Sequence, residues 1–127
     1  MSGKKFKILQ NPTFKEKVKI PRIGGEPIEV EFEFKYLVRK ELAKIYDGWQ
    51  DKLKELYNPE DEKTLSDLTD VEIAFQVMQL RDIVVGWDFE DEFNDENIEA
   101  LVETSVLAAK TVVEAYQEAY TKAKLGN

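Results

Sequence analysis

The 127-residue sequence contains no cysteine and no histidine. It therefore has no thiolate nucleophile, no disulfide, none of the usual zinc ligands and no side chain whose unperturbed charge changes near neutral pH. It also has no apolar run long enough to cross a bilayer, and its first five residues are not followed by the apolar stretch of a secretory signal. Most common active-site designs are excluded, and we expect a soluble cytoplasmic protein without a membrane partner.

The charges that are present lie unevenly along the chain. Lysine and arginine number 18 against 26 aspartate and glutamate, which gives a net charge of -8. Residues 1–22 hold seven basic residues and one acidic residue, a net +6, whereas residues 23–127 hold eleven and twenty-five, a net -14. Most of the surface should repel phosphates, so no nucleic-acid partner is expected. The length and the 43% apolar content predict one folded domain over residues 1–127.

Two runs of alternating apolar and charged residues predict a β-hairpin over residues 14–34. They are separated by residues 21–27, a stretch rich in glycine and proline. Residues 6–9 are a further candidate for a short third strand. Because the pattern then changes to a helical period, the predicted fold class is α+β.

The charge pattern selects one register for this hairpin. A two-residue turn would pair Val18 with Glu31 and mix apolar and charged side chains on one face. A three-residue loop instead pairs Val18 with Val30 and Lys17 with Glu31, and it places Gly25 where a left-handed residue is favoured. We therefore predict the register that sets a row of lysines opposite a row of glutamates.

Apolar residues then recur every three or four positions in three segments, which predicts helices over about residues 37–57, 70–85 and 94–124. Gly86 follows the second helix and suits a left-handed residue after its end. Asn94 is the predicted N-cap of the third helix. The expected architecture is an antiparallel hairpin packed with about three helices.

An acidic loop before the third helix places carboxylates at spacings that resemble a calcium-binding EF-hand. The resemblance fails at the sixth position, where the sharp turn needs glycine and the chain has Phe93. No pair of carboxylates has a spacing that indicates acid-base catalysis. The sequence therefore predicts no metal, no cofactor and no catalytic residue, and so no enzyme.

Aromatic residues are the strongest candidates for a partner site. Trp87, Phe89 and Phe93 lie close together in a loop of acidic residues, where they either cap the core or contact another protein. We predict that Trp87 closes the core and that Phe89 is the likelier anchor for a partner. Tyr116 and Tyr120, on the broad apolar stripe of the last helix, are further candidate partner-binding residues.

Several segments together resemble a known family, the tail assembly chaperones of long-tailed bacteriophages and prophages. The similar pieces follow the family's order over nearly the whole chain: residues 11–14, 18–21, 24–25, 30–35, the Val-Val-Gly-Trp-Asp segment 84–88, the Phe-Asn-Asp-Glu-Asn-Ile segment 93–98, and a tyrosine-bearing last helix. One departure is visible at residues 103–106, where relatives often carry a Tyr-Pro pair.

The resemblance implies a non-enzymatic chaperone that binds the tape-measure protein, keeps it soluble and assists tail tube assembly. The major tail tube protein is a further candidate partner, and a homo-oligomer is a further expectation. Such a protein would act in the cytoplasm of the infected or lysogenic bacterial host and be absent from the finished virion. The alternatives are a structural or adaptor phage protein, or a small acidic regulator of a host protein.

Overall fold

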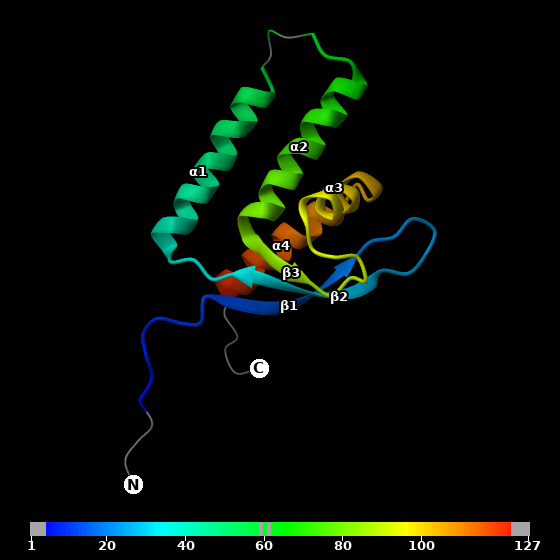
Figure 1. Ribbon diagram of the computed structural model, residues 1–127. Helices are drawn as coiled ribbons and strands as arrows, with labels where there is room; N and C mark the ends of the chain where they lie inside the picture. The colour runs from blue at the N-terminus through cyan, green and yellow to red at the C-terminus, as the bar shows by residue number, and fades with distance from the viewer. Residues whose placement is uncertain (1–4, 59, 61, 123–127) are drawn as a thin grey trace.

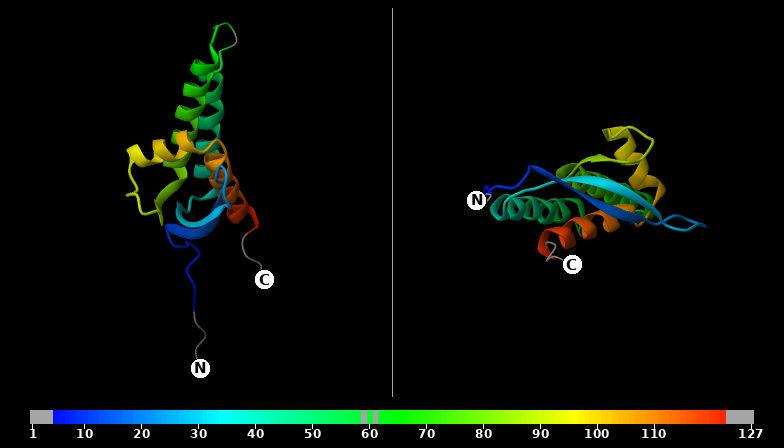
Figure 2. Two further views of the ribbon diagram at one scale, coloured as in Figure 1. Left: turned by 90° about the vertical axis from the view of Figure 1, so that its right-hand side faces the viewer. Right: turned by 90° about the horizontal axis from the view of Figure 1, so that it is seen from below.

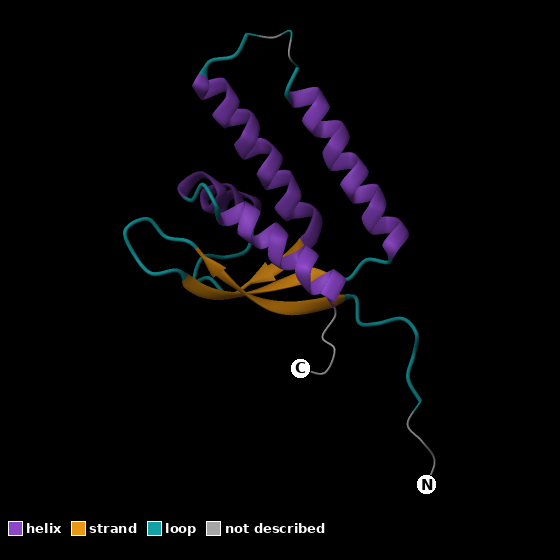
Figure 3. Ribbon diagram, turned by 180° about the vertical axis from the view of Figure 1, so that it is seen from behind, coloured by secondary structure: helices purple, strands orange, loops and turns teal. Residues whose placement is uncertain are grey.

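The part of the chain that the structure describes forms a three-stranded antiparallel sheet with four helices on one face (Figures 1 and 3). The computed structural model describes residues 5–58, 60 and 62–122. In chain order the elements are β1 Thr13–Ile20, β2 Ile28–Lys35, α1 Arg39–Leu56, α2 Leu65–Ile83, β3 Val84–Trp87, α3 Asp95–Thr104 and α4 Ala108–Lys122. The predicted α+β class is confirmed.

The β1–β2 hairpin has the predicted register. Lys17 lies opposite Glu31, and Val18 lies opposite Val30. The alternation explains this register, because Val18 and Val30 are buried against the helices while Lys17 is exposed on the outer face. One ion pair runs diagonally, with 3.8 Å between Lys17 Nζ and Glu29 Oε1, and both side chains are more than half exposed. Side-chain packing on the inner face, rather than this solvated pair, therefore holds the register.

Two predicted details of the sheet are wrong. The left-handed residue in the β1–β2 connection is Gly24, with φ 70°, and not Gly25. Residues 6–9 form no strand. The third strand is β3, which pairs antiparallel with β2 and places Trp87 opposite Phe32. The sheet therefore has the order β1-β2-β3, so that β2 is the central strand and β1 and β3 are the edge strands.

Helix α1 begins at Arg39 and ends at Leu56, close to the predicted range. Helix α2 begins at Leu65, earlier than the predicted residue 70, because Thr64 caps it. The Thr64 hydroxyl accepts from the Asp67 amide and the Asp67 carboxylate accepts from the Thr64 amide, both at 3.1 Å. This reciprocal capping box satisfies two amides that the first turn would leave unpaired.

The end of α2 also differs from the prediction. The helix stops at Ile83, and Val84 is already extended with φ -102° and ψ 138°. Gly86 is not left-handed, since it lies within β3 opposite Glu33. A short apolar run is compatible with a helix or a buried strand, and pairing with β2 decides for the strand here.

The predicted helix over residues 94–124 is two helices, α3 and α4, separated at residues 105–107 (Figure 2). Asn94 caps α3 as predicted, since its side chain accepts from the Asn97 amide at 2.8 Å. The chain becomes extended at Ser105; α3 packs on α2, and α4 then lies against both β1 and α2. Ala108 and Ala109 are fully buried, so the start of α4 approaches its neighbours closely. The break therefore lets the second part of one continuous apolar pattern reach β1 as well as α2.

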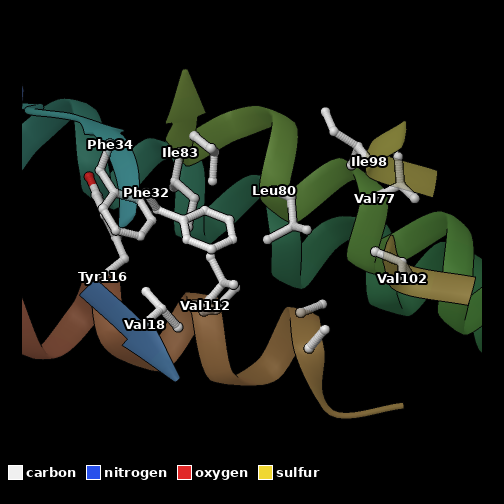
Figure 4. Packing of buried hydrophobic residues seen from close by; sticks show 14 of the residues in the cluster. Val18, Phe32, Phe34, Val77, Leu80, Ile83, Ile98, Val102, Val112 and Tyr116 are labelled. Atoms are coloured by element: carbon white, nitrogen blue, oxygen red, sulfur yellow. The ribbon is translucent and has the colours of Figure 1, made fainter. Parts of the chain in front are cut away.

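Buried side chains from the sheet, α2, α3 and α4 converge between the layers (Figure 4). The largest of them share complete or nearly complete burial: Tyr116, Phe32, Phe34, Leu80, Ile83, Ile98, Val18 and Val112. Helix α1 adds Leu42 and Trp49, and the Trp49 indole donates to Asp82 of α2 at 2.7 Å. Within the described part of the chain, every helix is too short or too polar to span a bilayer.

Candidate functional site

The aromatic loop, which we define as Trp87, Phe89 and Phe93, lies at the β3 edge of the sheet. Trp87 contacts Phe89 and Phe93 edge to face, with ring centroids 5.1 and 5.0 Å apart. Its indole N–H donates to the Asp91 carbonyl at 2.8 Å, and this hydrogen bond holds the backbone at Asp91 close to the Trp87 ring. Trp87 is half-buried and packs against the core. This geometry agrees with the core-capping role predicted for Trp87.

Phe89 has a structural role as well. Its ring meets Phe32 edge to face at 5.9 Å, in addition to Trp87, and the side chain is half-buried. This contact could not be expected from the sequence, because Phe32 lies far away along the chain. Phe89 therefore presents only part of its ring to solvent, and its role as a partner anchor stays a prediction.

Tyr116 lies in the middle of the core. Its side chain is 0% exposed, and its hydroxyl donates to the Lys35 carbonyl at 3.1 Å. Burial raises the pKa of Tyr116, because the charged phenolate would lose its solvation. In this conformation Tyr116 has no surface that a partner could contact, so any contribution to binding would act through the residues that it supports.

Tyr120, one turn further along α4, reaches the surface. Its hydroxyl donates to the Leu37 carbonyl at 2.7 Å, and its ring stacks on Tyr36 with centroids 6.2 Å apart. Partial burial raises its pKa, and the neighbouring Tyr36 adds to the rise. The half-buried ring is thus held in one orientation from two sides.

Two cavities meet at Tyr120, and we call them together the tyrosine groove. The larger, of about 870 Å³, lies between α4, β1 and the preceding N-terminal residues, with Phe6, Leu9, Phe14, Lys15, Tyr36 and Ala119 among its lining residues. The smaller, of about 460 Å³, lies between α1 and α4 and is lined by Arg39, Leu42, Ala43, Tyr46, Gln117, Tyr120 and Thr121. The smaller cavity is lined mainly by apolar surface, whereas the larger one also presents polar and charged side chains, among them Gln10, Asn11, Thr13 and Glu16. An apolar cavity of this kind can accept apolar side chains of another molecule.

Sequence reasoning missed the α1 side of this groove. Tyr46 contacts Trp49 with ring centroids 5.1 Å apart, and its hydroxyl is hydrogen-bonded to the Gln117 side chain. Burial raises the pKa of Tyr46, and that hydrogen bond opposes the rise. The spacing of four residues from Leu42 was an available sign that Tyr46 shares the inward face of its helix.

The four predicted partner residues do not form one site. A series of ring contacts runs from the aromatic loop through Phe32 and Phe34 to Tyr116, with centroids 6.0 Å apart between the two phenylalanines and 5.2 Å between Phe34 and Tyr116. From Tyr116 it continues to Tyr120 at 6.3 Å. The aromatic loop and the tyrosine groove are therefore two surfaces joined through the core.

The acidic residues around the aromatic loop form no metal site. Among the residues that the structure describes, no group of three or more acidic side chains is arranged to hold a metal ion. Asp95 lies instead 3.0 Å from Arg81 of α2 in an exposed ion pair. The carboxylates at the start of α3 are also favoured there by the helix dipole.

Comparison with known proteins adds one finding. The family model described as phage tail assembly chaperone matches residues 1–127. No curated protein and no solved structure matches the chain.

Proposed function

Since the chain belongs to the phage tail assembly chaperone family, we propose that it binds the tape-measure protein, keeps it soluble and helps to bring tail tube subunits to it. The proposed role involves no catalysis. It is carried out in the cytoplasm of the bacterial host, and the protein leaves before the virion is complete. Major tail tube protein is the second proposed partner.

The observation that carries this proposal is the tyrosine groove. Long helical partners are held by grooves with an apolar floor, because apolar side chains on one helix face enter together. Here Leu42 and Tyr46 of α1 and Tyr120 of α4 supply such a floor. The ring of Tyr120 is already fixed by its hydrogen bond to Leu37, so little side-chain freedom is lost on binding.

Charge at the groove indicates which helices it would prefer. Lys7, Lys15 and Arg39 line it, in a protein that is acidic overall. Glu16 also lines the larger cavity. We therefore propose that the bound segment is an amphipathic helix whose apolar stripe is flanked by acidic residues. The aromatic loop, surrounded by aspartate and glutamate, would suit a basic segment instead.

The test is co-expression with a tape-measure protein from the same phage or prophage, followed by measurement of its soluble fraction and of co-purification. Tyr120→Ala removes the ring from the groove and should weaken binding at least about tenfold, as loss of an aromatic anchor does. Arg39→Glu with Lys15→Glu should weaken binding without affecting the core. Lys40→Glu with Lys44→Glu, the same charge change at exposed positions on α1, is the matched control and should bind normally.

Each result has a distinct meaning. Failure of the wild-type chain to co-purify with the tape-measure protein would contradict the proposed function itself. Normal binding by both groove variants would place the contact elsewhere, with the aromatic loop next to be tested. Mass spectrometry of purified particles separates the chaperone from a virion adaptor, because only an adaptor remains in the particle.

A further inference from the structure

Strand β1 lies at one edge of the sheet, so one side of its backbone has no strand beside it. Such an edge presents amides and carbonyls that can pair with an extended segment of another chain. The strand is regular, because Thr13–Ile20 contains no proline and pairs with β2 without a register shift. Glu16 shares the inner face with Val18, and an inward charge disfavours pairing at the start of the strand. The regular end of β1, residues 17–20, is therefore the part suited to a further strand.

The hydrogen bonds of the hairpin show which groups of β1 face the free edge. The Tyr36 amide donates to the Pro12 carbonyl at 2.8 Å, so Pro12 directs its carbonyl toward β2. In an antiparallel pair this direction alternates from residue to residue, and the register of the hairpin is unbroken. Even-numbered residues of β1 therefore bond to β2, whereas Lys17 and Lys19 direct their amides and carbonyls away from it. Among the residues that the structure describes, none forms a backbone hydrogen bond with these outward groups.

The same two residues carry positive charge on the outer face of the sheet. Lys17 and Lys19 are exposed, and they lie opposite Glu31 and Glu29 of β2. A strand added to β1 would place every second side chain directly beside these lysines. Acidic residues at those positions would continue the alternation of charge, from the glutamates of β2 to the lysines of β1 and on to the new strand.

Helix α4 lies beside the inner face of this strand. It packs along β1 (Figure 2). Thr111, Ala115 and Ala119 are half-buried and recur every four residues on one side of the helix. Ala119 lines a cavity together with Phe14 of β1, which places that side of α4 next to the strand. Inward side chains of an added strand would meet these small residues, which leave room for apolar groups.

We propose that the β1 edge, defined as Lys17 and Lys19 with their outward amides and carbonyls, binds an extended segment of another protein in which acidic residues alternate with apolar ones. The acidic side chains lie beside the two lysines, and the apolar side chains lie beside α4. Neither lysine lines the tyrosine groove. The contact is therefore a second site, which goes beyond the proposed function and does not depend on tape-measure binding.

The charges of the strands disfavour a second copy of this chain as the occupant. Pairing of β1 with β1 of another copy would bring two rows of lysines together, and like charges at opposite positions are destabilising. The row of glutamates belongs to β2, which is the central strand and has no free edge. Strand β3, at the other edge, consists of Val84–Trp87 and has no acidic residue. Neither edge strand of a second copy supplies the acidic pattern.

The first experiment measures the charge preference of the edge with two synthetic peptides of about eight residues. One peptide has glutamate at every second position with threonine or valine between, and the other has lysine in place of each glutamate. Fluorescence polarisation should show that the glutamate peptide binds the full-length chain at least about tenfold more tightly. Lys17→Glu with Lys19→Glu should reverse this preference. Lys40→Glu with Lys44→Glu makes the same change in net charge at exposed positions on α1, and it should leave the preference unaltered.

Hydrogen exchange of single amides, followed by NMR, tests the backbone contact without a substitution. In the free chain the Val18 amide should be protected by β2, whereas the Lys17 and Lys19 amides should exchange rapidly. Saturating glutamate peptide should slow exchange at Lys17 and Lys19 at least about tenfold and leave Val18 unchanged.

Two variants at one position isolate the outward amide. Lys17→Pro removes it, which an edge strand tolerates where the amide faces away from its neighbour, and Lys17→Thr keeps it. Both variants lose the lysine charge. The proline variant should bind the glutamate peptide at least about tenfold more weakly than the threonine variant, while a protected Val18 amide shows that the hairpin is formed in both.

Several outcomes would overturn the proposal. These are equal affinity for the two peptides, no binding of either peptide, rapid exchange at Lys17 and Lys19 in saturating glutamate peptide, and equal binding by the proline and threonine variants. Protection of the two lysine amides that rises with the concentration of the chain alone would assign the edge to a second copy instead. Tape-measure binding is measured separately with the groove variants, so failure of the proposed function leaves these outcomes unaffected.

Discussion

Replacing Trp87 with alanine tests whether the aromatic loop closes the core. A half-buried indole removes on the order of 125 Å² from water, which at about 25 cal/mol/Å² corresponds to roughly 3 kcal/mol. The hydrogen bond to Asp91 adds about 1 kcal/mol. We therefore expect Trp87→Ala to lower the free energy of unfolding by about 3–4 kcal/mol.

Urea unfolding followed by far-ultraviolet circular dichroism measures this change. With a denaturant slope of about 1.5–2 kcal/mol/M, the midpoint should fall by about 2 M. Trp87→Phe keeps a ring but loses the N–H donor, so its urea midpoint should lie between those of the wild type and Trp87→Ala. Ile23→Ala is the control, because Ile23 is 92% exposed and its loss should cost less than about 0.5 kcal/mol. A Trp87→Ala midpoint within about 0.5 M of the wild type would refute the reasoning.

The same arithmetic applies to Phe89, so tape-measure binding by a Phe89 variant has to be compared at equal folded fraction. Its half-buried ring should contribute about 2 kcal/mol, so Phe89→Ala should also destabilise the fold. Loss of tape-measure binding by this variant indicates an anchor only where the folded fraction matches the wild type. A Phe89→Ala chain that is as stable as the wild type would contradict the edge-to-face contact with Phe32.

Three further predictions follow from the turns, the caps and the buried phenol. Gly24→Ala should lower the free energy of unfolding by about 1–2 kcal/mol, because φ is 70° at this residue. Gly86→Ala should lower it by less than about 1 kcal/mol, since the added Cβ would meet Glu33 at an ordinary distance of 3.7 Å. A lower urea midpoint for Gly86→Ala than for Gly24→Ala would contradict both φ values. Hydrogen bonds from the Thr64 amide and hydroxyl hold the pKa of Asp67 below its usual value, so stability present above about pH 4 should be lost as the pH falls through that lowered pKa. Thr64→Ala should weaken that acid dependence, and equal acid titrations of unfolding for both chains would exclude the capping box. Burial raises the pKa of Tyr116, so the stability of the wild type should fall as the pH rises above about 10. The stability of Tyr116→Phe should fall less steeply over the same range. Identical alkaline unfolding profiles for the two chains would count against a buried neutral phenol.

Several interactions between residues close in sequence were predicted correctly, although the Thr64–Asp67 capping box and the left-handed Gly24 of the hairpin, both local features, were not. The hairpin register follows from alternation and opposite charges on the two strands, and it set Lys17 opposite Glu31 as observed. Asn94 was recognisable as an N-cap because the amide that it satisfies is three residues away. The α+β class and the family resemblance also came from local patterns, and the match to the tail assembly chaperone model over residues 1–127 confirms that resemblance.

Contacts between distant residues explain two of the wrong predictions. The run ending at Trp87 is apolar enough for helix or strand, and β2 selects the strand by pairing Phe32 with Trp87. The break at Ser105 has no proline or glycine to mark it, and it accompanies the packing of α3 on α2 and of α4 on both β1 and α2.

The same distinction applies to the candidate site. Tyr116 and Tyr120 share one stripe of α4, four residues apart, and the sequence determined that both face the body of the protein. Only the tertiary structure decided that Tyr116 is fully buried beneath Phe34 while Tyr120 borders two cavities. Periodicity fixes the direction of a side chain from its helix, whereas its exposure depends on how far the sheet and α1 extend over it.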